Sequence, residues 1–91
     1  MGQEVLLFKN KERISRNEAA DFLRQLADKV SQGNVLLKQG SEEVQLSLPD
    51  NVILEVEVED EQKRRKGVQH KIEVELKWYE GDDQRGPMEL G

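Results

Sequence analysis

Apolar and polar residues follow two periods along this chain, one helical and one typical of strands. Between Ser15 and Gly33 the apolar positions recur every three or four residues and therefore share one side of a helix. These positions are Ala19, Phe22, Leu23, Leu26, Ala27 and Val30. Ser15 suits the N-cap, Glu18 completes a capping box, and Gly33 suits the left-handed residue that ends a helix. The pattern predicts one amphipathic helix that covers a core.

Alternation with period two predicts short strands on both sides of this helix. The predicted strands span residues 3–9, 34–39, 43–48, 52–59 and about 68–79. In the last two strands, apolar side chains occupy the even-numbered positions and are expected to face the core, whereas mostly charged side chains face outward. The charged segment 60–67 has nothing to bury and is expected to be a mobile loop.

This order of elements predicts an α+β fold in which the helix packs on one face of a four- to five-stranded, mostly antiparallel sheet, as a two-layer sandwich. The first strand is expected to pair with the last, because pairing beside the second strand would be parallel. We expect a single domain over residues 1–80, followed by a flexible C-terminal tail at 81–91, which is rich in Gly, Pro and Asp.

With the helix and the closing tryptophan both placed, the chain resembles the amphi-Trp domain family of small archaeal and bacterial proteins. The resemblance covers residues 3 to about 80 and supports the predicted fold. The family implies no assigned activity. The matching positions are Leu7-Phe8, Ser15-Arg16, Glu18-Ala19-Ala20, Phe22-Leu23-Arg24, Leu26-Ala27, Gly33, Gly40, Val44-x-Leu46, Pro49 and Leu76-x-Trp78-Tyr79.

The amino-acid composition limits the kinds of catalytic and metal sites that the chain can form. The chain has no cysteine and one histidine, so disulfides, thiolate catalysis and the usual zinc sites are not expected. His70 stands alone, and no nucleophile elbow or glycine-rich phosphate loop is present, so we expect a protein that is not an enzyme and needs no cofactor. The longest apolar run, residues 5–8, is too short for a membrane span, which favours a soluble cytoplasmic protein without membrane contact.

An acidic row follows the outward positions of the last two strands: Glu55, Glu57, Glu59, Glu73 and Glu75. A register that places Lys71 opposite Glu57 or Glu59 would relieve the repulsion between like charges. A solvated face is the simplest interpretation. The alternatives are a carboxylate metal site for a hard cation and a docking face for a basic partner.

Four adjacent cations, Lys63, Arg64, Arg65 and Lys66, could hold phosphates of a nucleic acid. No aromatic residue is interleaved to stack bases, and Glu59, Asp60 and Glu61 precede the cations. Together with the net charge of −5, these features favour a solvated loop and argue against a nucleic-acid partner.

Trp78 is expected to close the core at the end of the sheet, or alternatively to anchor a partner. Tyr79 would form an exposed apolar strip with Ile53, Leu36 and either Leu6 or Phe8, beside the outward glutamates on the open face of the sheet. The function predicted from the sequence is therefore a non-catalytic interaction module that binds an unknown protein partner, or itself as a homodimer, through this face. Nucleic-acid binding by residues 63–66 and carboxylate metal binding are the alternatives.

Overall fold

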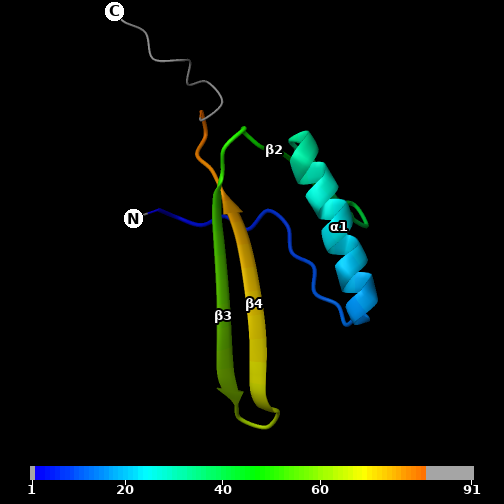
Figure 1. Cartoon of the computed structure of the whole chain (residues 1–91), viewed down its shortest axis with the longest axis vertical. Helices are drawn as coiled ribbons and strands as arrows, with labels where there is room; N and C mark the ends of the chain where they lie inside the picture. The colour runs from blue at the N-terminus through cyan, green and yellow to red at the C-terminus, as the bar shows by residue number, and fades with distance from the viewer. Residues whose placement is uncertain (1, 82–91) are drawn as a thin grey trace, which may run out of the picture. The chain divides into compact units, whose positions relative to one another are not determined.

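The computed structural model describes residues 2–81 and contains one helix and four strands within them (Figure 1). Helix α1 spans Arg16–Gln32, and the strands are β1 (Asn34–Gln39), β2 (Glu42–Ser47), β3 (Ile53–Lys63) and β4 (Gly67–Lys77). The strands pair antiparallel as two two-stranded sheets, β1 with β2 and β3 with β4. The chain divides into two compact units, Met1–Leu48 and Pro49–Gly91, and each is described by itself.

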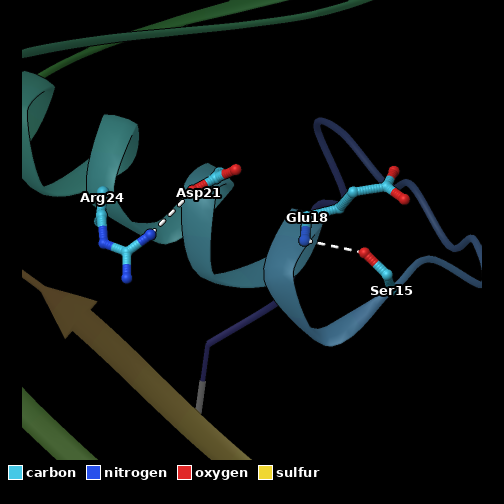
Figure 2. A network of polar contacts seen from close by, with 4 residues as sticks. All are labelled: Ser15, Glu18, Asp21 and Arg24. Carbon is cyan, nitrogen blue, oxygen red and sulfur yellow. Dashed lines mark hydrogen bonds and ion pairs between the residues drawn. The ribbon is translucent and has the colours of Figure 1, made fainter.

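Both ends of α1 carry the predicted caps. The Ser15 hydroxyl accepts a hydrogen bond of 3.0 Å from the backbone N–H of Glu18 (Figure 2), which satisfies one of the amides that a helix start leaves without a partner. Gly33 adopts φ 83°, and its N–H donates to the carbonyls of Lys29 and Val30. The helix therefore begins and ends where the sequence predicts.

Replacing Ser15 with alanine is expected to lower the free energy of unfolding by about 1 kcal/mol, because the Glu18 amide loses its acceptor. Arg24→Glu is the matched control on the same helix. Its ion pair with Asp21 measures 2.8 Å (Figure 2), but both side chains are largely exposed, so the change should cost only a few tenths of a kcal/mol. Urea denaturation followed by circular dichroism measures both, and a Ser15→Ala loss no larger than that of Arg24→Glu would contradict the cap.

In the unit Met1–Leu48, α1 contacts strand β1. Val35, in β1, is 5% exposed and is the one buried apolar side chain among residues 2–81. It pairs with Leu46, and the next pair on the same face is Leu37 with Val44; these three are half-buried. Leu36, on the opposite face of β1, is 46% exposed. The alternation of the sequence thus selects the face of this hairpin that contributes to the core.

In the unit Pro49–Gly91, β3 and β4 form a long hairpin with eleven residue pairs, from Ile53↔Lys77 to Lys63↔Gly67 (Figure 1). Its apolar face holds Leu54, Val56, Val58, Ile72, Val74 and Leu76. The first five of these side chains are 58–73% exposed. Leu76, the cross-strand partner of Leu54, is half-buried.

The α+β class, the amphipathic helix and the antiparallel pairing of the last four predicted strands into hairpins are confirmed. The predicted strand at 3–9 is wrong, because these residues join no strand ladder and Val5, Leu6 and Leu7 are 66–75% exposed. The predicted loop at 60–67 is also wrong for most of its length, since β3 continues to Lys63 and β4 begins at Gly67.

The domain boundaries stay predictions. The sequence predicts that α1 packs on one continuous sheet and that residues 1–80 form one domain. The strands form two separate hairpins, and the chain divides into two units that are described separately, so both stay predictions. The predicted tail at 81–91 lies outside the described residues except for Gly81, which belongs to a turn after β4.

Candidate interaction surfaces on the second hairpin

A pocket lies where the β3–β4 hairpin meets the residues that follow β4. We call it the end pocket; its volume is about 440 Å³, and it is lined by Ile53, Leu76, Lys77, Trp78 and Tyr79. Ile53 is 51% exposed, Tyr79 is 74% exposed and Trp78 is half-buried. The structure therefore brings together the three predicted partner-binding residues that are not glutamates, and it adds Leu76 and Lys77 to them.

The face of the hairpin opposite to the apolar face is charged. We call seven residues of this side, five glutamates and two lysines, the charged face, and Glu61 and Lys63 lie on the same side nearer the turn; the seven are Glu55, Glu57, Glu59, Lys71, Glu73, Glu75 and Lys77. Two pairs of glutamates lie directly opposite each other, Glu55↔Glu75 and Glu57↔Glu73. Like charges in such positions repel, so the face depends on the cations between them.

Each lysine of the charged face bridges two glutamates. Lys77 Nζ lies 3.0 Å from a carboxylate oxygen of Glu55 and 3.6 Å from one of Glu75. Lys71 Nζ lies 3.2 Å from Glu59 and 3.1 Å from Glu73. The cross-strand pair of Lys71 with Glu59 is one of the two registers that the sequence predicts, and it is confirmed.

These bridges shift the pKa values of Glu55, Lys71 and Lys77. A hydrogen bond from Lys77, reinforced by the charge of its ammonium group, holds the pKa of Glu55 below its usual value. The same contacts raise the pKa of Lys77. Hydrogen bonds to Glu73 and then Glu59 raise the pKa of Lys71. The ion pairs therefore favour the charged forms of Glu55, Lys71 and Lys77.

Glu57 differs from its neighbours. It sits at the middle of the charged face, opposite Glu73, and its side chain makes no hydrogen bond or ion pair with any of residues 2–81. The charged face thus has more carboxylates than lysines, and the carboxylate without a cationic partner among residues 2–81, that of Glu57, lies between the bridges made by Lys71 and Lys77. Such a face attracts cationic groups.

A metal ion is a poor fit to this carboxylate row. No group of three or more His, Cys, Asp or Glu side chains within residues 2–81 is arranged to hold one. Strands that run straight present their glutamates in a line, whereas Ca²⁺ and Mg²⁺ prefer six or more oxygens around one point. The carboxylate metal alternative therefore finds no ligand set in the described part of the chain.

The predicted basic loop takes the form of a turn at the far end of the same hairpin. Lys63 closes β3 and pairs with Glu61 at 2.6 Å, and Gly67 opens β4 with φ 82°. The turn itself consists of Arg64, Arg65 and Lys66, all exposed; we call these three residues the basic turn.

A second hollow, in the unit Met1–Leu48, was not predicted. It measures about 660 Å³, and its apolar lining comes from Phe8, Ile14, Phe22 and Leu37. Charged and polar side chains complete it: Lys9, Asn10, Glu12, Glu18 and Lys38. A hydrogen bond of 3.3 Å from Gln39 to Asn10 ties the N-terminal segment to β1 beside this hollow. Phe8, the last residue of the apolar run at 5–8, is the sequence signal for this hollow, although the run predicts a strand.

These features define a small α+β protein in which one capped amphipathic helix is followed by two antiparallel hairpins and Trp78 directly follows the last strand. The Amphi-Trp domain family has a sequence model that matches residues 1–91, and the chain belongs to this family. Searches of curated proteins and of solved structures found no match. Within residues 2–81, no helix combines the length and the apolar character needed to cross a bilayer.

Proposed function

We propose that this protein is a small non-catalytic interaction module that binds a protein partner through the end pocket and the adjoining charged face of the β3–β4 hairpin. The observation that carries the proposal is the position of the two features. Ile53 and Lys77 line the end pocket, they form the first residue pair of the hairpin, and the next pair on the same face is Glu55↔Glu75. An apolar anchor site thus adjoins an acidic row.

This combination favours a particular kind of partner. Interfaces derive most of their binding energy from a few apolar or aromatic side chains buried in pockets, while charges around them guide encounter and fix orientation. A partner segment with one apolar anchor for the end pocket, followed by Lys or Arg side chains facing Glu57, would satisfy both. The lysines of the charged face would keep their own bridges, since Lys71 and Lys77 already have two carboxylates each.

Self-association through the same face is the other form of the proposal, but it is less favourable. Two copies placed face to face would bring two acidic rows together, and like charges oppose each other. The proposal therefore favours a basic partner over a second copy. A cytoplasmic location, predicted from the sequence, stays part of this proposal.

The experiment is affinity capture with three forms of the chain: the wild type, Ile53→Asp and Leu36→Asp. Ile53 and Leu36 are similarly exposed, at 51% and 46%, and lie on different hairpins, so the two variants match in chemistry and in effect on folding. A genuine partner should be retained by Leu36→Asp and should bind Ile53→Asp at least about 10-fold more weakly, as expected for an anchor residue. Equal capture by both variants would contradict the proposal, and sedimentation equilibrium of the wild type reports self-association.

A further inference from the structure

The basic turn, Arg64, Arg65 and Lys66, lies at the tip of a structured arm rather than in a mobile loop. The last residue pair of the hairpin is Lys63↔Gly67, which places only these three residues beyond the ladder. Gly67 takes φ 82°, a left-handed conformation that suits glycine and allows the chain to reverse tightly. The turn thus presents three adjacent cations at the end of an eleven-pair ribbon.

The acidic residues that precede the turn are engaged by partners of their own. A carboxylate oxygen of Glu59 lies 3.2 Å from Lys71 Nζ, and one of Glu61 lies 2.6 Å from Lys63 Nζ. Asp60 lies across from His70, with 2.6 Å between its carboxylate oxygen and the ring Nδ1. Proximity in sequence suggested that these acids would neutralise the cations of the turn, but their side chains are directed to other partners.

The cations of the basic turn have no such compensation. The side chains of Arg64, Arg65 and Lys66 make no ion pair or hydrogen bond with any of residues 2–81. Lys71 and Lys77, further along the same hairpin, each contact two carboxylates. The positive charge of the hairpin that is available to a ligand is therefore concentrated at its tip, in a protein whose net charge is −5.

We propose that the basic turn is a second binding site, which contacts the phosphates of double-stranded DNA. The DNA major groove is wide enough to admit a two-stranded β-ribbon, and Arg guanidinium groups bind phosphate oxygens in a bidentate manner. The turn carries no aromatic side chain, which favours backbone contact with a duplex over the base stacking that single strands require. Anionic membranes are recognised by clusters of four to eight basic residues, more than the tip supplies.

Three phosphate contacts make a definite prediction about salt. Each contact releases counterions, so the logarithm of the binding constant should fall with the logarithm of salt concentration at a slope of about −2.7. Raising the salt from 50 to 200 mM should then weaken binding roughly 40-fold. The acidic remainder of the protein keeps the affinity modest, so the measurement belongs at low salt.

The test is fluorescence anisotropy with a labelled 20-base-pair DNA duplex and the full chain. The variant replaces Arg64, Arg65 and Lys66 with serine; the control replaces Lys9, Lys11 and Arg13, three exposed cations of the N-terminal segment, so both proteins have the same net charge. Circular dichroism should show that both remain folded. The tip variant should bind at least about 10-fold more weakly than wild type, whereas the control should lose much less.

Three results would overturn this proposal. They are no binding of the wild type to the duplex at 50 mM salt, equal losses in the two variants, and tip-dependent binding to phosphatidylserine vesicles without binding to DNA. The residues tested lie at the opposite end of the hairpin from the end pocket, so this experiment and the capture experiment with Ile53→Asp fail independently.

Discussion

Val35→Asp is expected to unfold the unit Met1–Leu48. Val35 is 5% exposed and pairs with Leu46 of β2, and α1 contacts strand β1, to which Val35 belongs. A carboxylate at this position would be removed from water with no cation beside it, which costs several kcal/mol. Domains of this size have a total stability of roughly 5–13 kcal/mol, so most of that margin would be lost.

The adjacent residue provides the control for this prediction. Leu36 belongs to the same strand but lies on its other face, with 46% of its surface exposed, so Leu36→Asp should cost less than about 1 kcal/mol. Helix content by circular dichroism and urea midpoints distinguish the two variants. Similar losses for Val35→Asp and Leu36→Asp would show that β1 has no buried face, contrary to the structure.

Gly33→Ala is expected to reduce stability by about 1–2 kcal/mol through the backbone alone. Gly33 has φ 83°, a conformation that is strained for residues with a Cβ atom. The space around it is not limiting, since an added Cβ would lie 3.6 Å from its nearest neighbour, the carbonyl oxygen of Leu48. The cost therefore comes from the left-handed conformation that links α1 to β1.

Gly33→Asn distinguishes the effect of backbone conformation on stability from the effect of side-chain size. Asn tolerates the left-handed region better than alanine although its side chain is larger, so Gly33→Asn should be the more stable of the two variants. Urea denaturation gives both values. If alanine were as stable as glycine, or more stable than asparagine, the assigned cap would be contradicted.

Local signals in the sequence predict the local structure well. The spacing of apolar residues, together with Ser15 and Gly33, locates α1 to within one residue at each end, because capping and helical period depend only on near neighbours. The two faces of β3 and β4 also follow from alternation alone. Since the side-chain period of a strand is two, the confirmed pairing of Glu59 with Lys71 fixes which side chains share each face.

Features that depend on pairing between distant segments are harder to predict. The run at residues 5–8 is apolar at every position, so its composition suits a strand but cannot supply the neighbouring edge that a strand needs. The mostly charged composition of residues 60–63 predicts a loop. In the structure, cross-strand partners such as His70 for Asp60 extend the ladder through them.

In the candidate site, too, the sequence predicts the local features but not those that depend on pairing between strands. The sequence predicts that Ile53 and Tyr79 share the parity of the acidic row, and the end pocket contains both. It gives no sign that Lys77 lies between Glu55 and Glu75 at the border of that pocket, because this contact depends on the register between strands. The sequence also gives no sign that the basic turn lacks ion pairs with the acids that precede it. This follows from the structure, where each of those acids pairs with another residue.

Photo-crosslinking from position 57 tests the central claim most directly, because Glu57 lies in the middle of the charged face. A photoreactive residue placed there, in cells that produce the protein, should yield a discrete adduct with a partner, and Ile53→Asp in the same chain should abolish it. The same residue at Gln45, exposed on β2 of the other hairpin, should not give this adduct. Adducts of equal yield from positions 57 and 45, or no adduct from 57, would contradict binding through this face.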